Sequence, residues 1–405
     1  MDQTTPKKTV PTFCYQCVAG PDLMRVEVEG GIATRIESNY SIGNEHPGGG
    51  RVCVKAYGLI QKTYNPDRVK TPMKRTNPKK GRDEDPGFVP ISWDEALDTV
   101  AGKLRKAIDD GLTDTSGYPR IAASFGGGGT PTQYMGTFPA FLAALGNVDL
   151  GFGAGQGVKC YHSEHLYGEL WHRAFIVAPD TPRVNYILSC GHNGDASTGV
   201  AGIWRHADAR VRGMKRVQVE PHQSITGAVS AEWIPIKPKT DAAFLYGVIH
   251  RILHERDWRA DCDIPFLKDD TVAPYLVGPN GYYLRDPETR KPLIHDLADG
   301  INKPFDGDIS DAALEGSFTV SGIEVGADAD EWSHDAIQAR TAHQVLLDHM
   351  KPYDPEWAAA ECDVPADRIR SVADEFIANA CVGETIEIEG ETLPFRPVAV
   401  LLGKT

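Results

Sequence analysis

Three cysteines near the beginning of the chain have the spacing of a metal-binding framework. Cys14 and Cys17 are separated by two residues, and Cys53 follows after 35 more. Thiolates two residues apart in a tight turn can bind one iron or zinc, and a distant cysteine can close the cage. No further cysteine lies nearby, so Asp22 is the candidate fourth ligand. We prefer an iron–sulfur site over a structural zinc or three incidental buried cysteines.

A second group of reactive side chains follows Cys160, namely His162, Glu164, His165 and Tyr167. A soft thiolate suits a redox metal, and the two histidines could donate or accept protons. Two other interpretations stay open. The segment could be a helix N-terminus with a polar face, in which the cysteine is a small apolar filler. It could also be a hydrolase built on Cys160 and His162, which would leave the N-terminal cysteines unexplained.

Glycines and polar residues follow several apolar runs, as they do in nucleotide-binding folds. Residues 126–129 follow the run 120–125, and residues 191–194 follow the run 184–190. Such turns bring backbone amides close to phosphates, although neither has the complete G-x-G-x-x-G pattern. Glu220 ends a third run, where an acidic side chain can accept hydrogen bonds from a ribose.

Elements of two kinds must position these groups. The apolar runs predict buried parallel strands at 120–125, 184–190 and 216–220. A capping box, with Ser92 as cap and Glu95 three residues later, predicts a helix from 92 to about 104. Strands that alternate with helices indicate an α/β fold with doubly wound, mostly parallel sheets. Further helices are predicted at 137–145, 242–256, 338–350 and 366–380.

The chain divides into four predicted regions. Residues 1–65 form a small β-rich cysteine module, with a hairpin of 24–28 and 32–36 around Gly30-Gly31. The α/β domain covers 66–265, an irregular insertion rich in Asp, Gly and Pro covers 266–335, and a further α/β domain begins at 336–405. Because only three residues follow the strand-like run 397–402, we expect the chain to be cut short inside a βα unit.

Length, charge and composition exclude some classes of protein. The 405 residues suffice for two or three domains. With 42 Lys and Arg against 56 Asp and Glu, the net charge is −14, which argues against nucleic-acid binding. The sequence contains neither an apolar run of about 18 residues nor an N-terminal signal core, so we expect a cytoplasmic protein. In a reducing compartment the cysteines favour metal binding or catalysis over disulfides.

Taken together, the motifs resemble the large subunits of the dimethyl sulfoxide reductase family, which carry the bis-molybdopterin guanine dinucleotide cofactor. The resemblance covers nearly the whole chain and keeps the family's order. The motifs that carry it are the cysteine module with Arg51-Val-Cys53-Val-Lys55, then Tyr64-Asn-Pro-Asp-Arg68 and Ile91-Ser-Trp-Asp-Glu-Ala96, and finally Asn193, Glu220 and Pro238-Lys-Thr-Asp241.

By this resemblance, residues 1–65 are the iron–sulfur module and 66–265 the molybdopterin-binding domain. The three N-terminal cysteines would hold a 4Fe-4S cluster, Lys55 would lie between cluster and pterin, and Cys160 would bind molybdenum, with His162 or His165 accepting a proton. A final group of residues would hold the guanosine and phosphates of one cofactor: Gly191, Asn193, Glu220, Thr240 and Asp241.

Two positions depart from the family pattern. Pro21 stands where the family usually has its third cysteine, which makes Asp22 the alternative ligand and a 3Fe-4S cluster the alternative cofactor. Lys239 replaces the glycine that is common in the guanine-binding turn, so that contact is less well supported. For Thr240 and Asp241, simple capping of the helix at 242 is the competing interpretation.

The module and the residues around Cys160 are most similar to the phenylacetyl-CoA:acceptor oxidoreductases. That similarity implies oxygen-atom transfer or hydroxylation at molybdenum, with an aryl-acetyl-CoA as the small-molecule substrate. One alternative function is that of an arsenate, thiosulfate or polysulfide reductase. A second alternative is that the chain is an inactive fragment that acts only as an iron–sulfur protein. The resemblance implies two partners: a separate iron–sulfur protein that transfers electrons and, as an option, a membrane anchor that would bring the chain to a membrane.

Overall fold

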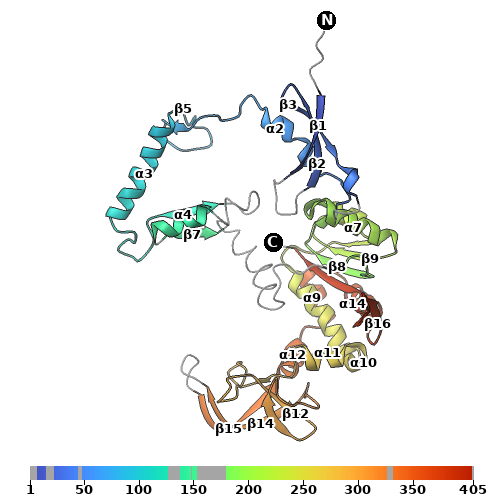
Figure 1. Ribbon diagram of the computed structural model, residues 1–405. Helices are drawn as coiled ribbons and strands as arrows, with labels where there is room; N and C mark the ends of the chain where they lie inside the picture. The colour runs from blue at the N-terminus through green and yellow to red at the C-terminus, as the bar shows by residue number, and fades with distance from the viewer. Residues whose placement is uncertain are drawn as a thin grey trace. The chain divides into compact units, whose positions relative to one another are not determined.

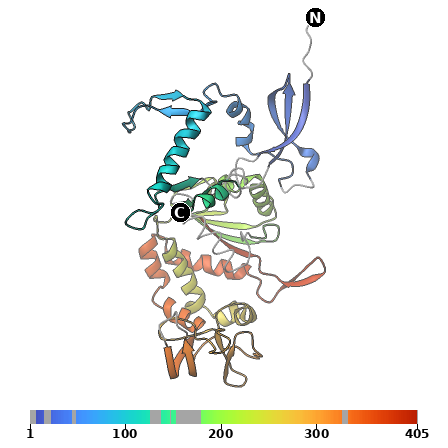
Figure 2. The same cartoon turned by 60° about the vertical axis from the view of Figure 1, so that its left-hand side comes forward.

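A computed structural model describes residues 7–14, 22–43, 48–125, 137–146, 148–152, 179–325 and 332–403. The chain separates into two compact units, shown in Figures 1 and 2. The first unit takes the described residues up to Pro179 together with Asn193–Asp208, and the second takes Asp180–His192 and Ala209–Gly403. Within the described residues, no helix is long and apolar enough to cross a membrane.

The N-terminal module is a three-stranded antiparallel sheet with the order β1-β2-β3. Gly30 and Gly31 have φ of 58° and 86°, the left-handed values that a tight hairpin turn requires, so the predicted hairpin is confirmed. A short helical segment, η1 (Tyr40–Ile42), follows the sheet. The strands are β1 (Lys7–Cys14), β2 (Asp22–Glu29) and β3 (Ile32–Ser38), and the helices α1 (Val54–Tyr57) and α2 (Leu59–Thr63) cover one face.

The helix predicted from the capping box is α3 (Trp93–Asp109). The Ser92 Oγ accepts a hydrogen bond from the Glu95 amide at 3.1 Å, which confirms the cap. The Glu95 carboxylate does not reach back to Ser92 but pairs with Lys74 Nζ at 3.0 Å. The other elements of this unit are the antiparallel pair β4 (Met73–Arg75) and β5 (Phe88–Pro90), the parallel pair β6 (Ala122–Phe125) and β7 (Asp149–Phe152), and the helices α4 (Phe138–Leu145) and α6 (Gly194–Ser197).

The second unit is built on a four-stranded parallel sheet with the order β10-β9-β8-β18. Both central strands contribute to one large hydrophobic cluster, and Ile187 of β8 belongs to a second one, while β9 carries the buried polar residues Arg216 and Gln218. The predicted α/β class with a parallel sheet is confirmed. The strands are β8 (Tyr186–Cys190), β9 (Lys215–Val219), β10 (Glu232–Ile234) and β18 (Val398–Leu402); α9 (Asp241–His250), α13 (Pro355–Cys362) and α14 (Ala366–Asn379) cover one face.

The position of β18 differs from the prediction. The sequence places residues 397–402 in a separate domain, but β18 pairs in parallel with β8, with Val398 opposite Tyr186 and Leu402 opposite Cys190. The strand therefore completes the sheet formed by β8–β10. Its apolar sequence predicts a strand but carries no information about a partner some 200 residues earlier in the chain.

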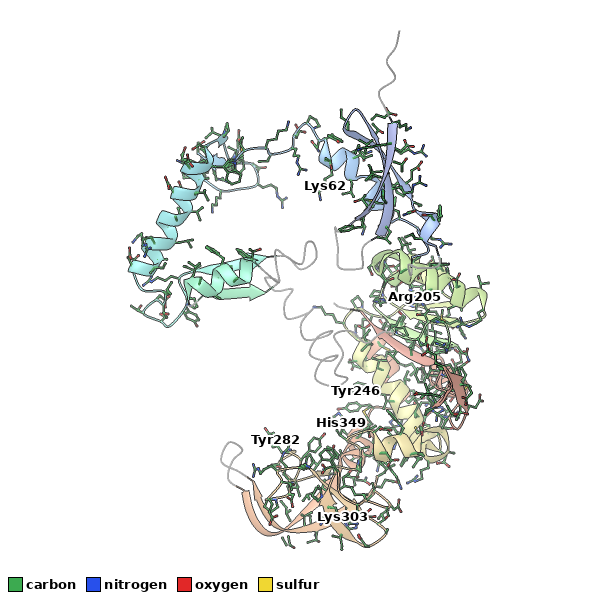
Figure 3. The ribbon with its side chains drawn as sticks, in the orientation of Figure 1. Lys62, Arg205, Tyr246, Tyr282, Lys303 and His349 are labelled. Atoms are coloured by element: carbon green, nitrogen blue, oxygen red, sulfur yellow. The ribbon has the colours of Figure 1, made fainter. Side chains whose placement is uncertain are left out.

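The segment predicted to be irregular contains antiparallel strands instead. Turns separate its strands, and a buried side chain organises one of these turns: the Asp296 carboxylate accepts hydrogen bonds from Lys303 Nζ at 2.7 Å and from the Asp311 amide at 2.9 Å. Lys303 is labelled in Figure 3. Asp and Gly in such turns hide the strand pattern in the sequence. The strands are β11 (Leu276–Val277), β12 (Leu293–Asp296), β13 (Ile301–Pro304), β14 (Ser317–Val325) and β15 (Trp332–Thr341).

Helices join this β-region to the parallel sheet. Helix α9 continues into a π-helical turn, η4 (Arg251–Glu255), and the rings of Tyr246 on α9 and His349 on α12 lie 6.1 Å apart (Figure 3). The predicted helix at 366–380 corresponds to α14, and the one predicted at 338–350 corresponds to α12 only from Ala342 onward, because residues 338–341 belong to β15. The remaining elements are α7 (Gly199–Val211), α8 (Ile225–Val229), α10 (Trp258–Asp261), α11 (Ile264–Asp269), α12 (Ala342–Met350), β16 (Thr385–Ile388) and β17 (Glu391–Pro394).

Candidate functional site

The carboxyl edge of the parallel sheet has the geometry of a nucleotide-binding site. In the order β10-β9-β8-β18, the chain adds strands on one side of β8 and then returns to the other side with β18. Ligands in open α/β sheets bind outside the carboxyl ends of the strands at this type of switch point. Gly191 follows β8 and Gly403 follows β18, so the two glycines stand at the switch point.

Gly403 lies so close to the Gly191 backbone that it has no room for a side chain. A Cβ atom added to Gly403 would lie 2.0 Å from the Gly191 carbonyl oxygen, and Gly191 has φ of 61°, a left-handed value that favours glycine. Each amide is held by a neighbouring strand: Gly403 N donates to Cys190 O at 2.8 Å, and Gly191 N donates to Val219 O at 2.9 Å. The result is a cradle of bare backbone, the kind of surface that allows close approach of a phosphate group.

Glu220 extends from the end of β9 at the same edge, and its carboxylate is buried and held by two hydrogen bonds. Oε1 accepts from the Ser224 amide at 2.7 Å, and Oε2 accepts from Gln218 Nε2 at 2.9 Å. Gly227 makes room for the carboxylate, because a Cβ there would lie 2.6 Å from Oε1. Each carboxylate oxygen keeps a second lone pair, so Glu220 could still accept a hydrogen bond from a ligand.

The turn before α9 brings Asp241 to this edge. Asp241 is the first residue of α9, which packs against β8 in the main hydrophobic cluster. Burial raises the pKa of the Cys190 thiol to about 12, and the negative charge of Asp241 contributes to the shift. Thr240 occupies the N-cap position, but its hydroxyl donates to Lys237 O at 2.6 Å and does not cap the helix. Lys239 has φ of 69°, a value that favours glycine, in agreement with the glycine of the family pattern.

Asn193 belongs to the first unit and occupies the N-cap position of the short helix α6. Its carbonyl oxygen accepts hydrogen bonds from Ser197 Oγ at 2.8 Å and from the Ala196 amide at 3.2 Å. A short helix therefore begins directly after Asn193, two residues beyond Gly191. The structure assigns Asn193 to a different unit from Gly191, Glu220 and Asp241, so its predicted role in holding the nucleotide stays a prediction.

The described part of the cysteine module places three of the predicted groups. Cys14 is the last residue of β1 and lies directly opposite Asp22, the first residue of β2. Cys14 is half-buried and packs against the same small hydrophobic cluster as Val52, the neighbour of Cys53. Cys53 itself is the N-cap residue of α1, and Lys55 lies on that helix with an exposed side chain.

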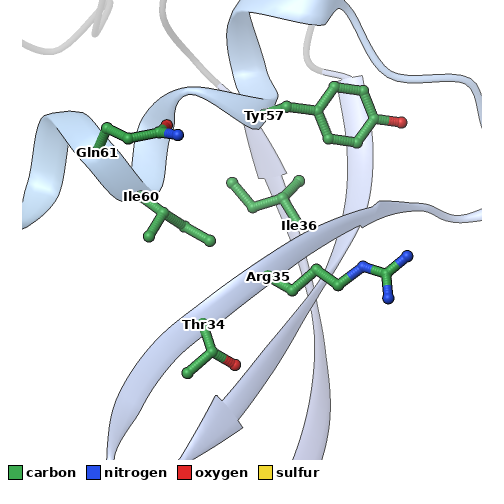
Figure 4. Close-up of a pocket in the computed structure, with 6 residues that line it drawn as sticks. All are labelled: Thr34, Arg35, Ile36, Tyr57, Ile60 and Gln61. Atoms are coloured by element: carbon green, nitrogen blue, oxygen red, sulfur yellow. The ribbon is translucent and has the colours of Figure 1, made fainter.

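A cation–π contact supports the loop that carries Cys53. The guanidinium of Arg51 lies 4.0 Å from the centroid of the Trp204 ring on α7. Gly49, with φ of 58°, packs beneath the same ring, since a Cβ there would lie 2.6 Å from Trp204 Cζ3. A shallow pocket of about 360 Å³ opens elsewhere on the module, lined by Thr34, Arg35, Ile36, Tyr57, Ile60 and Gln61 (Figure 4). None of those residues belongs to the predicted site.

Four predicted site residues lie outside the described residues, namely Cys17, Cys160, His162 and His165, as does the side chain of Asp22. Their predicted roles as ligands or proton carriers stay predictions. Two residues at the sheet edge are missing from the prediction, Gly403 and Gln218. A glycine that follows an apolar strand is the signal that points to Gly191, and the same pattern at Gly403 could have been used. A polar residue within an otherwise apolar strand is the available signal for Gln218.

Comparison with known proteins agrees with this geometry. The profile of the family "Molybdopterin oxidoreductase" matches residues 68–340, about two thirds of the chain. The chain therefore belongs to the molybdopterin oxidoreductase family. Membership confirms the predicted family, and it implies molybdenum and a molybdopterin cofactor.

Individual relatives are more distant. The molybdopterin-containing subunit of arsenate respiratory reductase from Shewanella sp. is 29% identical over 64% of this chain and 28% of that protein. A sulfite dehydrogenase from Allochromatium vinosum is 26% identical over 90% of this chain and 36% of the matched protein. The dimethyl sulfoxide reductase of Escherichia coli is 28% identical over 58% of this chain and 29% of that protein.

A solved structure supports the fold. Acetylene hydratase from Pelobacter acetylenicus aligns with 92% of this chain and 39% of its own, with a TM-score of 0.55 and 18% identity. The chain spans between 28% and 36% of the lengths of the three curated relatives named here.

Proposed function

We propose that this chain forms part of the catalytic subunit of a molybdenum-dependent oxidoreductase and binds the guanosine end of a bis-molybdopterin guanine dinucleotide cofactor. The observation that carries the proposal is the switch-point edge, where the backbone cradle follows β8 and β18, the Glu220 carboxylate follows β9, and Asp241 begins the helix after β10. Family membership supplies the chemistry: the cofactor, when bound, provides a molybdenum centre that exchanges two electrons with substrate.

The residues at the edge suit the parts of such a cofactor. Gly191 and Gly403 leave the strand ends free of side chains where a diphosphate needs close approach, and a Cβ at Gly403 would collide with the Gly191 backbone. Glu220 offers a fixed carboxylate to a ribose hydroxyl, and Asp241 offers a second one to the base. In this proposal Thr240 acts through its backbone, because its hydroxyl already donates to Lys237 O.

The cysteine module is proposed to hold the iron–sulfur cluster, with Cys14, Cys17 and Cys53 as ligands. Asp22 is the proposed fourth ligand, and its support is its position opposite Cys14 in the β1–β2 register. With three thiolates and one oxygen donor, 4Fe-4S is the proposed cluster and 3Fe-4S its alternative. Lys55, exposed on the helix that begins after Cys53, would add positive charge to the path of the electrons.

For the metal centre, Cys160 is the proposed protein ligand of molybdenum, and His162 or His165 the proposed proton acceptor. The proposed substrate is an aryl-acetyl-CoA, which rests on the sequence around Cys160. A second candidate is the reduction of an oxyanion such as arsenate, and the observation that favours it is the similarity to an arsenate respiratory reductase. The proposed partners are a separate iron–sulfur protein that transfers electrons, together with a membrane anchor, and the chain would lie on the cytoplasmic side.

The test is the molybdenum and iron content of anaerobically purified protein, per chain. We expect molybdenum near one and iron near three or four. Cys160→Ala should abolish turnover with phenylacetyl-CoA or arsenate and leave the cluster spectrum intact, whereas Cys53→Ala should remove iron. Cys381→Ala, at a cysteine of the second unit that is not a predicted ligand, is the matched control. Iron without molybdenum would contradict the proposal and favour an iron–sulfur protein.

A further inference from the structure

Gln218 is an unusual residue for its position. It is fully buried in β9, next to the last residue of the strand, where Val217 and Val219 on either side face the main hydrophobic cluster. A strand covered on both faces is normally apolar throughout, because a buried amide must replace all of its hydrogen bonds to water. A glutamine at this position therefore requires an explanation.

The orientation of the Gln218 amide follows from its neighbours. Nε2 donates to Glu220 Oε2 at 2.9 Å and to His192 O at 3.3 Å. Both partners are pure acceptors, so the amino group must face them and Oε1 must face the other way. Within the described residues, Oε1 has no hydrogen-bond partner, and neither has Oγ of Ser189, its buried register partner on β8. The Gln218 amide therefore donates to Glu220, while its own acceptor, Oε1, has no hydrogen-bond partner among the described residues.

Glu220 depends on this contact for its position. The Ser224 amide holds Oε1, but a single hydrogen bond would let the carboxylate rotate about it. Gln218 holds the second oxygen and at the same time ties Glu220 to the loop after β8 through His192 O. One side chain therefore connects the carboxylate to the loop that begins with Gly191, the other half of the cradle.

We propose that Gln218 is a positioning residue for nucleotide binding, which sets the direction of the Glu220 carboxylate relative to the Gly191 loop. The inference rests on the proposed function, because it takes the guanosine part of the cofactor as the ligand of Glu220. A buried amide that leaves one acceptor unsatisfied is a poor choice for stability alone, and it is explained if the residue is kept for binding.

The test uses Gln218→Met, which keeps the length of the side chain and removes its amide. Protein purified and dialysed anaerobically is assayed for guanosine monophosphate released from the cofactor by acid, for iron and for the midpoint of thermal unfolding. We expect nucleotide per chain to fall by about tenfold, as for the loss of one hydrogen bond to a charged group. Iron should not change, and the unfolding midpoint should stay or rise, since methionine removes an unsatisfied acceptor.

Gln338→Met, at an exposed position on β15, is the matched control and should leave all three values unchanged. Gln218→Leu, a shorter apolar side chain, guards against a packing defect specific to methionine and should behave like Gln218→Met. Unchanged nucleotide in both variants would overturn the inference and leave the proposed function standing. A lower unfolding midpoint together with loss of both iron and nucleotide would show that Gln218 has a structural role, and it would also overturn the inference. Wild-type protein without nucleotide would overturn both proposals.

Discussion

The carboxyl edge of the parallel sheet and the cysteine module hold their functional groups in different ways. At the edge, the groups are backbone atoms and the buried Glu220 carboxylate at strand ends, so the pairing of β8 with β9 and β18 places them. In the module, Cys14 ends an edge strand and Cys53 begins a helix of four residues. The first site is formed by the fold before any ligand binds.

The two regions also differ in the cores beneath them. The edge rests on a large cluster that includes Tyr186, Val217, Phe244 and Ile369, all fully buried. The module has a cluster of three buried residues, Met24, Ile36 and Ala56. Small domains with little core are commonly stabilised by a metal, because its binding energy is also folding energy. Nucleotide binding should thus depend on the sheet, and the module should depend on its cluster.

The largest effect on stability and on nucleotide binding is expected when a side chain is introduced at Gly403. Gly403→Val would place a branched side chain 2.0 Å from the Gly191 oxygen, so β18 must move away from β8. We expect a loss of about 3 kcal/mol or more in the free energy of unfolding, the range of severe overpacking, together with loss of bound nucleotide. Urea denaturation and acid-released guanosine monophosphate measure the two effects.

The control for this prediction is Gly102→Ala on α3, where an added Cβ meets nothing within 4 Å. That variant should be neutral or more stable by up to about 1 kcal/mol, because alanine favours a helix interior. If Gly403→Val binds nucleotide as the wild type does, the cradle is not part of the site.

The two regions were also predictable to different degrees. The apolar runs at 184–190 and 216–220, with Gly191 and Glu220 at their ends, predict both strands and their chemistry, since each signal is local. The pairing of β18 with β8 is not local, and so the partnership of Gly403 with Gly191 could not be predicted from composition or periodicity.

In the module, spacing predicts the ligands and Gly30-Gly31 predicts the hairpin, because a tight turn has a recognisable sequence. The contact of Arg51 with Trp204 joins residues about 150 positions apart, and nothing in the sequence links them. The strands of 276–341 were hidden for another reason: Asp and Gly in their turns, such as Asp296, give the segment the composition of a loop.

A smaller effect is expected in the pH dependence of stability, through the thiol of Cys190. Burial and then the charge of Asp241 raise the pKa of Cys190 from 9.0 to about 12 in the folded chain. The raised pKa means that the folded state prefers the neutral thiol, so its contribution to stability is complete below pH 9 and is lost as the pH rises toward 12. In that window the free energy of unfolding should fall by up to about 1.4 kcal/mol per pH unit on account of this thiol.

Urea denaturation of the wild type and of Cys190→Ala at pH 8, 9, 10 and 11 measures the slope. The variant starts from a lower stability because it leaves a small cavity, but its decline with pH should be shallower. Parallel slopes would contradict the raised pKa of the Cys190 thiol. A shallower slope in Asp241→Asn, where the thiol is kept and the charge removed, would support the contribution of the Asp241 charge to that pKa.

The smallest effect concerns the module. Trp204→Leu removes the ring beneath Arg51 and Gly49, and the loss of a cation–π contact of about 0.5–1 kcal/mol should loosen the loop that carries Cys53. We expect iron to be released to a chelator roughly three- to fivefold faster, with nucleotide content unchanged, because the ring supports the module and not the sheet edge.

Trp204→Phe should restore most of the wild-type rate. Trp93→Leu, at a largely exposed ring on α3, is the control and should release iron as the wild type does. If the nucleotide is lost in Trp204→Leu while iron is retained, the contact belongs to the nucleotide site, and the division between the two regions is wrong.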